Sequence, residues 1–192
     1  MTVSADVDFL TYKIDRTFDM LDGDADGLLT EADLCGLADG MAKALGEASD
    51  APKIVELRDA FRHFWHSELG RMSSDSSREV LTREDFCAGM RGRATSQGPE
   101  ARDEFLGNVG VMTHCWMDIG SRDGDGRVTR DEFVAMYHNG MGVPEGELGD
   151  AFAELDVDGD GLLDRDEVRQ ATAEYYTSED PEAPGNWLFG PI

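Results

Sequence analysis

The sequence predicts an all-α protein built from a repeated helix–loop–helix unit, and three observations support this fold class. An acidic twelve-residue pattern recurs along the 192-residue chain, with acids at window positions 3 and 5, glycine at 6 and an aliphatic residue at 8. The segments on both sides of these windows place apolar residues at helical spacing. Hydrophobic residues make up 40% of the chain, which is enough to form a core. Internal repetition of this kind determines the architecture of the whole chain.

Three windows carry the full pattern, and a fourth carries it in part. The full windows are "DGDADGLLTEAD" (Asp22–Asp33), "SRDGDGRVTRDE" (Ser121–Glu132) and "DVDGDGLLDRDE" (Asp156–Glu167). The fourth, Ser74–Asp85, emerges when Leu81 is aligned with the aliphatic residue at position 8. Because three windows repeat the same chemistry, a chance set of solvated acidic turns is a poor explanation.

The segments around the windows predict helices in chain order. Residues 7–21 precede the first window with apolar residues near helical spacing, and Ala51–Gly70 forms a long amphipathic segment before the fourth. Residues 144–155 lead into the last window, and Pro144 suits a first helical turn. The stretch "SQGPE" (Ser96–Glu100) interrupts the helical pattern midway and starts the second half of the chain.

The spacing of the acids suits the coordination of calcium. Calcium takes six to eight oxygen ligands at about 2.3–2.6 Å, and acids at positions 1, 3 and 5 bring carboxylates to one side of a turn. Glycine at position 6 permits the backbone angle that swings the chain around the ion. Position 7 offers a backbone carbonyl, and position 12 closes the shell, best as a bidentate Glu. The pattern resembles the EF-hand, in which a calcium loop joins two helices.

The spacing between the loops suggests a narrower resemblance. The loops start at residues 22, 74, 121 and 156, whereas loops of the calmodulin type are nearly evenly spaced. Over essentially its whole length the chain resembles the compact sarcoplasmic calcium-binding proteins and their bacterial calerythrin-like relatives. That resemblance implies a compact globular all-α fold of four EF-hands in two packed lobes, with short β-bridges between paired loops. We number the hands in chain order, and expect hands one and two over residues 1–95 and hands three and four over 96–178.

Hands one and four carry the most complete ligand sets, and each loop has a net charge of −5. Hand one departs at position 12, where Asp33 is one methylene shorter than the usual Glu. We therefore expect hand one to be weaker for calcium and more tolerant of magnesium, which prefers octahedral coordination. The expected ligands are Asp22, Asp24, Asp26, the Leu28 carbonyl and Asp33 in hand one, and Asp156, Asp158, Asp160, the Leu162 carbonyl and Glu167 in hand four.

Hand three lacks the first carboxylate, because Ser121 stands at position 1. Its loop holds four acids and three arginines, a net charge of −1, and calcium affinity follows ligand charge. We expect this hand to bind calcium less tightly than hand four. Its expected ligands are Ser121, Asp123, Asp125, the Arg127 carbonyl and Glu132.

Hand two has lost almost every ligand. Positions 1, 3 and 5 hold Ser74, Ser76 and Arg78, and Glu79 replaces the glycine at position 6. An arginine near the place of the ion would oppose a cation, so we expect no metal there. The hand is predicted to pair with hand one through residues 80–81, as Val128 of hand three is predicted to pair with Leu163 of hand four.

The C-terminal tail, residues 179–192, reads "EDPEAPGNWLFGPI" and contains three prolines, so it is not predicted to be helical. Its apolar cluster, Trp187 to Phe189, is an unfavourable group to leave in water. We expect the tail to pack over the apolar surface between the lobes and close it. The opposing hypothesis is that calcium releases the tail and uncovers a groove, for which nine methionines would suit an adaptable surface.

The composition limits the classes of binding partner and the cellular compartment that we expect for this chain. A net charge of −24 and a pI of about 4.2 argue against nucleic acid and anionic membranes, and favour cations and basic or apolar protein segments as partners. Cys35, Cys87 and Cys115 form no disulfide framework, which favours a reducing compartment. The N-terminus lacks a signal-peptide pattern, and no apolar run reaches membrane-spanning length. We expect a soluble, cytoplasmic monomer.

Two other kinds of site are weaker explanations of the sequence. His63, His66 and His114 could hold zinc, but histidines beside aromatic residues on a helix are usually packing residues. Coelenterazine photoproteins share the four-hand architecture, and His114, Trp116, Tyr137 and Trp65 are residue types found around their cavity. No arrangement of nucleophile, base or phosphate loop predicts an enzyme.

The sequence therefore predicts a calcium-binding protein that is not an enzyme. Filling three sites would change the net charge from −24 to −18, so calcium should stabilise the fold by relieving repulsion between carboxylates. Two roles remain open: an intracellular buffer or signal modulator that binds about two to three calcium ions, and a sensor that exposes an apolar groove for a partner helix.

Overall fold

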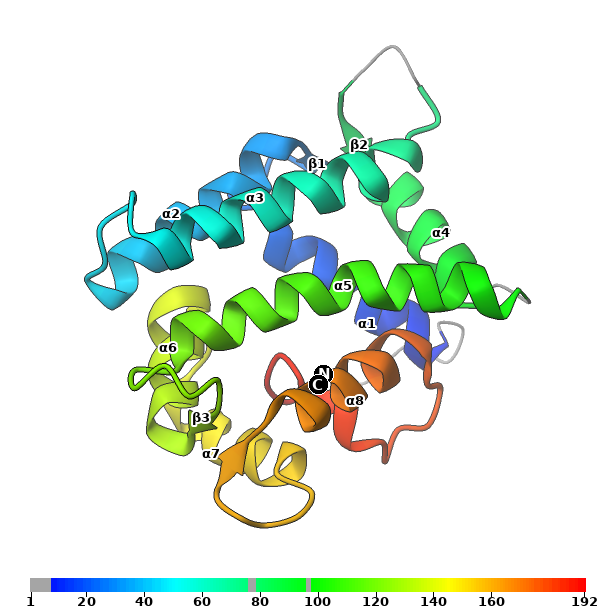
Figure 1. The fold of residues 1–192 in the computed structure, drawn as a ribbon. Coiled ribbons are helices and arrows are strands. Elements are labelled where there is room, and N and C mark those ends of the chain that lie inside the picture. The colour runs from blue at the N-terminus through cyan, green and yellow to red at the C-terminus, as the bar shows by residue number, and fades with distance from the viewer. Residues whose placement is uncertain (1–7, 76–78, 96–97) are drawn as a thin grey trace.

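The computed structural model describes residues 8–75, 79–95 and 98–192, and this part of the chain is predominantly helical (Figure 1). The α-helices are α1 (Phe9–Leu21), α2 (Glu31–Leu45), α3 (Pro52–Ser67), α4 (Arg83–Ala94), α5 (Pro99–Gly120), α6 (Arg130–Met141), α7 (Glu145–Leu155) and α8 (Arg165–Thr177). Short 3₁₀ turns follow α3 and α8, at η1 (Leu69–Arg71) and η2 (Pro184–Trp187). The predicted all-α fold class is confirmed.

Two antiparallel strand pairs join the loops of neighbouring hands. The strands are β1 (Leu28–Leu29), β2 (Leu81–Thr82), β3 (Val128–Thr129) and β4 (Leu162–Leu163). Leu29 faces Leu81 in the first pair, and Val128 faces Leu163 in the second. These are the position-8 residues, so the predicted β-bridges are confirmed. The aligned register of the fourth window is confirmed with them.

Each exiting helix begins where its loop supplies a cap. Thr30, Thr129 and Asp164, all at position 9, accept hydrogen bonds from the backbone of the residue at position 12. The position-12 carboxylate accepts a bond from the backbone of position 9 in return, which completes a capping box. The same carboxylate that would close a calcium shell therefore also starts the helix.

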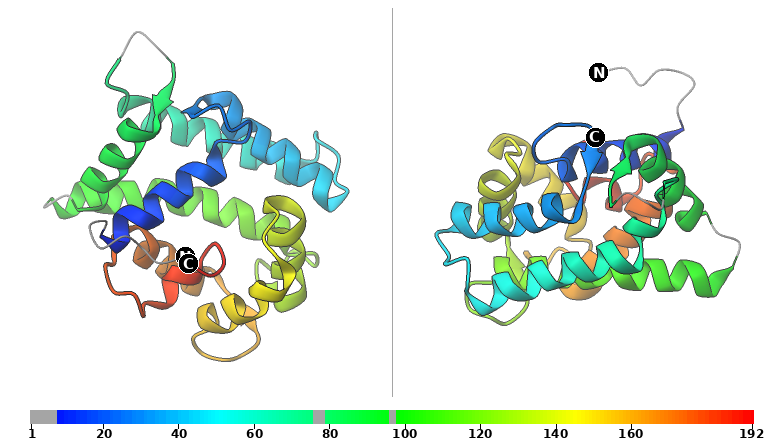
Figure 2. Two further views of the ribbon diagram at one scale, coloured as in Figure 1. Left: turned by 180° about the vertical axis from the view of Figure 1, so that it is seen from behind. Right: turned by 90° about the horizontal axis from the view of Figure 1, so that it is seen from above.

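The two lobes share one core. Helix α3 lies along α5, and α2 contacts α6, so helices of the first two hands pack directly on helices of the last two (Figures 1 and 2). Buried aromatic rings line this core, with Phe18 packed edge-on against Phe86 and Phe133 against Phe152. The two packed lobes of the predicted fold are confirmed, while the exact boundaries at residues 95 and 178 stay a prediction.

The tail runs back across the molecule and packs against α7 and α8, where Figure 1 draws it in red. Leu188 is only 3% exposed, and Trp187 and Phe189 pack against the core around it. Gly185 approaches α8 so closely that a Cβ there would lie 2.5 Å from the Ala171 carbonyl oxygen. A side chain larger than hydrogen would therefore displace this turn from the helix.

Candidate metal centres

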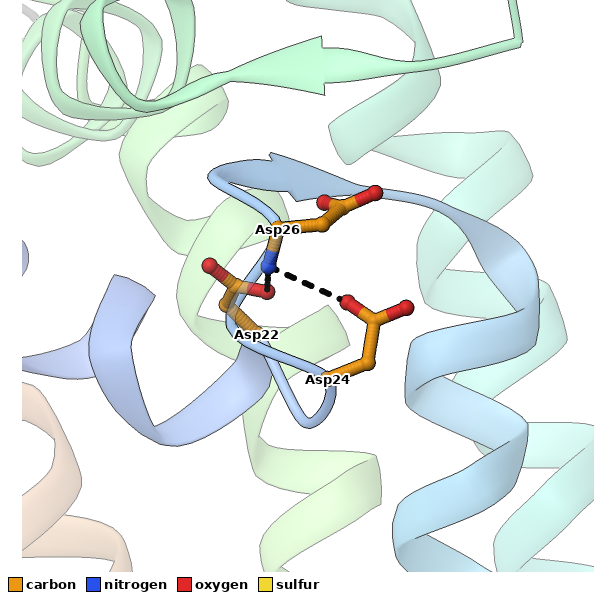
Figure 3. A group of neighbouring side chains, drawn as sticks. All are labelled: Asp22, Asp24 and Asp26. Carbon is orange, nitrogen blue, oxygen red and sulfur yellow. Dashed lines mark hydrogen bonds between the residues drawn. The ribbon is translucent and has the colours of Figure 1, made fainter.

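Hand one brings three carboxylates together on one turn between α1 and β1 (Figure 3). One oxygen each from Asp22, Asp24 and Asp26 lies within 4.8 Å of the others. The amide of Asp26 donates to Asp22 Oδ1 and Asp24 Oδ1, both at 3.2 Å, and this holds the carboxylates toward one point (Figure 3). Three convergent hard oxygens match the donor set that calcium requires.

Hand four converges in a different way. Asp156, Asp158 and Glu167 each offer an oxygen within 4.8 Å of the others, so position 12 takes part in the cluster. Glu167 Oε1 accepts hydrogen bonds from the Val157 amide at 3.0 Å and the Asp158 amide at 3.4 Å. The carboxylate at the end of the loop is thereby drawn back toward its beginning, which suits a ligand that closes the shell.

Position 12 distinguishes hand one from hand four. Asp33 Oδ2 accepts bonds from the Thr30 amide at 2.8 Å and the Thr30 hydroxyl at 2.6 Å. In the described loop of hand one, no hydrogen bond joins Asp33 to the residues at positions 2 and 3, unlike Glu167. The missing methylene shortens the reach of Asp33. Tolerance of magnesium at this hand stays a prediction.

Hand three keeps the shape of a binding loop around a neutral first residue. Ser121 is 4% exposed, and its hydroxyl accepts the Gly126 amide at 3.2 Å and donates to Asp123 Oδ1 at 3.2 Å. Glu132 Oε1 accepts the Arg122 amide at 2.9 Å, so the end of this loop also folds back on its start. Within the described chain, hand three gathers no group of three carboxylates like those of hands one and four.

An arginine within hand three competes for one of its expected ligands. Arg127 donates from Nε at 3.0 Å and from Nη2 at 2.8 Å to Asp125 Oδ2. Hydrogen bonds from the Arg127 amide and then its side chain lower the pKa of Asp125. Burial acts to raise the pKa of Glu132, but bonds from the Thr129 and Arg122 amides outweigh it and lower that pKa. Both carboxylates are therefore ionised at neutral pH.

Hand two is described only in part, because Ser76 and Arg78 lie outside the described residues. Position 1 and position 12 contact each other directly there, since the Ser74 hydroxyl donates to Asp85 Oδ2 at 3.2 Å. The Thr82 hydroxyl donates to the same oxygen at 2.8 Å. The absence of metal at hand two remains a prediction, and the contribution of its loop to pairing with hand one is confirmed by β2.

A buried cation on α1 was missed by the sequence analysis. Lys13 is 0% exposed, and its Nζ donates to the Ser178 carbonyl at 2.9 Å, to Asn186 Oδ1 at 2.9 Å and to the Glu174 carbonyl at 3.3 Å. The sequence did contain a signal of this buried lysine, because Lys13 lies three residues after Leu10 on the buried face of α1. A cation on such a face needs buried acceptors, and only the fold could supply them.

The residues considered for zinc or for a photoprotein-like cavity do not come together. Trp116 and Tyr137 line the central cavity, with ring centroids 5.6 Å apart. His114 instead lines a groove between α5 and α8, and Trp65 lines a hollow between α2 and α3. Among the described residues, these histidines form no cluster with metal-ligand spacing. The four side chains therefore do not surround one cavity, which agrees with the treatment of a photoprotein-like site as a weaker explanation.

Comparisons with known proteins agree with this geometry. The family model described as "EF hand" matches residues 122–137 and 148–171. Calerythrin of Saccharopolyspora erythraea is 28% identical over 164 residues, which cover 85% of this chain and 90% of the relative. A solved calcium-binding protein of Streptomyces coelicolor, described in terms of prokaryotic calcium-mediated regulation, has a TM-score of 0.72 at 26% identity. That match covers 88% of this chain and 98% of the other.

A third likeness concerns the fold alone. The calcium-regulated photoprotein mitrocomin of Mitrocoma cellularia has a TM-score of 0.71 at 22% identity, covering 100% of this chain and 98% of that one. Together, the paired loops, the convergent carboxylates and the family match define a calcium-binding EF-hand protein. Within that class, the similarity to calerythrin and to the Streptomyces protein confirms the predicted resemblance to the calerythrin-like EF-hand proteins. None of the helices that the structure describes is both long and apolar enough to cross a membrane.

Proposed function

We propose that this protein is a calcium buffer or signal modulator whose apolar core stays closed when calcium binds. The observation that carries the proposal is the anchoring of the tail, residues 179–192, between the lobes by α1. A sensor must expose apolar surface to a partner helix. Here that surface is already covered by the chain's own Leu188 and Phe189.

Lys13 forms the centre of this anchor. Its three acceptors belong to the last turn and end of α8 and to the tail, so one buried cation joins α1, α8 and η2. A positive charge at a helix C-terminus is favourable because the carbonyls there are otherwise unpaired. Burial lowers the pKa of Lys13 to about 8, although Glu174 acts to raise it. The side chain is therefore still largely protonated at neutral pH.

Two further contacts hold the end of the tail. Arg16, one helical turn after Lys13, donates from Nη2 to the Phe189 carbonyl at 2.9 Å and from Nη1 to the Pro191 carbonyl. Gly185 allows the turn to rest against the backbone of α8. Because α1 leads into hand one and α8 leads out of hand four, the tail is fixed by the helices of two different calcium loops. Release would require several buried polar groups to lose their partners together.

We propose two to three calcium ions per chain, at hands four and one and more weakly at hand three. Calorimetric calcium titration with magnesium competition gives the number and classes of sites. We also propose that the protein acts as a cytoplasmic monomer without catalytic activity, and three cysteines without disulfide partners support a reducing compartment. A basic or apolar protein segment remains a candidate partner, because the chain carries a net charge of −24.

The second candidate is a calcium sensor, and one observation favours it. Five of the nine methionines, Met20, Met41, Met90, Met112 and Met141, line the apolar cavity beneath the tail. Methionine-rich surfaces adapt to different partner helices. In that case calcium would have to break the Lys13 and Arg16 contacts and expose this lining.

A calcium titration with a fluorescent dye for apolar surfaces separates the two roles. We expect little change for the wild-type protein and a clear increase after deletion of residues 184–192, with a loss of thermal stability. A large calcium-dependent increase in the wild-type protein would establish the sensor instead. An unchanged dye signal and stability after the deletion would contradict the covering role of the tail.

Substitution of Lys13 tests the anchor itself. Lys13→Met leaves three acceptors without their donor, of which two are half-buried and Asn186 is buried, so we expect a loss of about 1–3 kcal/mol in the free energy of unfolding at pH 7. Lys43→Met is the matched control, because it removes the same charge from an exposed position on α2. Equal effects of the two substitutions in urea unfolding would show that the anchor contributes nothing.

The lowered pKa of Lys13 gives a second readout of the same anchor. Between about pH 8 and its ordinary value of 10.5, the native state binds fewer protons than the unfolded state. The free energy of unfolding of the wild type should therefore rise relative to Lys13→Met across this window, by at most about 1.4 kcal/mol per pH unit. A constant difference across the window would mean that burial does not perturb this lysine.

A further inference from the structure

We propose that the cavity between the lobes binds a compact, largely apolar organic ligand that carries one hydrogen-bond acceptor. The cavity has a volume of about 100 Å³ and lies where helices of both lobes meet the tail. It is separate from the calcium loops, so the site would add a second kind of ligand to a calcium-binding protein. The inference goes beyond the proposed function, and either one can fail without the other.

The lining of the cavity selects against charge. No charged side chain takes part among the described residues, and the lining consists mainly of aliphatic, aromatic and methionine side chains. An ion would have to give up its hydration without a compensating partner, which costs far more free energy than the transfer of an apolar group. The five methionines give the walls adjustable shape, because the thioether side chain is unbranched and flexible.

A void of this size is unusual in a natural core. Protein interiors are packed about as densely as organic crystals, and few voids exceed the volume of a water molecule. An apolar cavity lowers stability because the atoms around it lose contacts, and such cavities stay dry and bind small apolar molecules. A ligand that fills the cavity would restore those contacts. An apolar cavity of about 150 Å³ holds benzene, so this smaller cavity, with its adjustable methionine walls, should fit a ligand of no more than about six or seven non-hydrogen atoms.

One polar group in the cavity wall is the reason why the ligand should carry a hydrogen-bond acceptor. The indole nitrogen Nε1 of Trp116 is buried and makes no hydrogen bond of good geometry among the residues that the structure describes, although it interacts with the Tyr137 hydroxyl. Trp116 lines the cavity, where its ring packs edge-on against Tyr137. A buried donor whose hydrogen bond is poorly made costs free energy. A carbonyl or ether oxygen on the ligand would accept this N–H and remove that cost.

The tail closes the cavity on one side. Leu188 and Phe189 form part of the lining, and the Arg16 and Lys13 contacts keep them in place. A ligand can therefore be enclosed without any opening of the calcium loops. Binding should stabilise the closed form, in the presence or absence of calcium.

The test uses cyclohexane and cyclohexanone, which have nearly the same shape but differ in one acceptor oxygen. Both should raise the melting temperature of the calcium-loaded wild-type protein and bind at a single site. In spectra of the wild-type protein with ¹³C-labelled methionine methyl groups, shifts should concentrate at the five cavity methionines. Met72 lies outside the cavity lining and should not shift. Shifts at Met72 alone, or no binding of either compound, would overturn the proposal.

Two variants locate the site and its donor. Gly140→Leu places a side chain into the cavity, because a Cβ on Gly140 would make only ordinary contact, 3.4 Å from Met41 Cγ, and binding should be lost. Gly36→Leu is the matched control, since it replaces an exposed helical glycine with open space around it. Unchanged binding by Gly140→Leu would place the ligand elsewhere and overturn the proposal.

The variant Trp116→Phe tests whether the indole N–H donates a hydrogen bond to the acceptor oxygen of the ligand. The variant should weaken binding of cyclohexanone by about fivefold relative to cyclohexane, because only the ketone can accept the indole N–H. Comparing two ligands in one variant cancels any general change in cavity shape. An equal change for both compounds would overturn the assignment of Trp116 as the donor to the ligand.

Discussion

Hands three and four have nearly the same loop backbone but very different charge. The amides at position 6, Gly126 and Gly161, donate to position 1 in both loops, at 3.2 Å to Ser121 Oγ and 3.0 Å to Asp156 Oδ2. The amide at position 2 donates to the position-12 Glu at 2.9 Å in hand three and 3.0 Å in hand four. The net loop charges nevertheless differ, at −1 and −5. Loop shape is therefore maintained by hydrogen bonds that a hydroxyl can also make.

What the hydroxyl cannot supply is a second oxygen and a charge. Asp156 Oδ1 accepts the Asp160 amide at 3.1 Å, in addition to the bond from Gly161. The single oxygen of Ser121 leaves that additional bond unmade in the described loop of hand three. Arg127 also holds the side chain of Asp125, whereas no arginine pairs with Asp160 in the described chain. Hand three thus combines an intact loop framework with a less negative loop, for which we expect a weaker attraction for a cation.

The largest effect should come from removing the closing carboxylate of hand four. Glu167→Gln should lower the calcium affinity of that hand by about 100-fold, because it removes one charge and one strong ligand. At a calcium concentration 1,000 times the dissociation constant, hand four should contribute about 4 kcal/mol of stability, and the variant should lose much of this. Calorimetric titration and thermal unfolding measure the two changes.

The control for Glu167→Gln is Asp166→Asn, which changes the same charge at an exposed neighbour outside the expected ligand set. If both variants bound calcium equally well, general loop charge rather than position 12 would determine affinity.

Restoring the missing carboxylate should make hand three more like hand four. Ser121→Asp should raise the calcium affinity of hand three by about tenfold, a gain of about 1.4 kcal/mol in binding free energy, since the framework already suits an acceptor at this position. Calcium titrations of the variant and of the wild-type protein measure this gain in affinity. No change would mean that the three arginines or the geometry limit the affinity.

Lengthening position 12 extends the comparison to hand one. Asp33→Glu adds the methylene that lets Glu132 and Glu167 reach the amide at position 2. Calcium affinity at hand one should rise by about fivefold and magnesium affinity should change less, because a bidentate carboxylate suits calcium. Magnesium competition during calcium titration measures the ratio, and a parallel rise for both ions would contradict the role assigned to chain length.

The smallest expected effect distinguishes the contribution of the Arg127–Asp125 ion pair from that of the overall charge of the loop. Arg127→Gln should raise the calcium affinity of hand three by about threefold, because it frees Asp125 while the position-7 carbonyl remains. Arg122→Gln removes the same charge from an exposed residue of the same loop and should act less strongly. Equal gains would show that the Arg127–Asp125 pair is broken at no cost when calcium enters.

The calcium loops were predictable from sequence because their chemistry is local. Twelve consecutive residues contain the acids, the turn glycine and the cap, so spacing alone placed Asp22–Asp33 and Asp156–Glu167 on helix–loop–helix units. The apolar residue at position 8 was enough to predict the pairing of Leu29 with Leu81 and of Val128 with Leu163. The sequence could not place His114 and Trp65 relative to one cavity, and the structure puts them in separate hollows, because periodicity does not determine how helices rotate against each other.

The sequence by itself determined the fold class, the four hands and the order of their ligand charge, since each depends on residues close together in the chain. Only the tertiary structure decided how the lobes meet, where the tail lies and which groups surround Lys13. Those contacts join residues more than 160 positions apart, such as Lys13 with Ser178 and Asn186. Their geometry depends on the packing of every helix between them. A buried lysine is stable only where folding brings acceptors to it, and no local pattern in α1 contains that information.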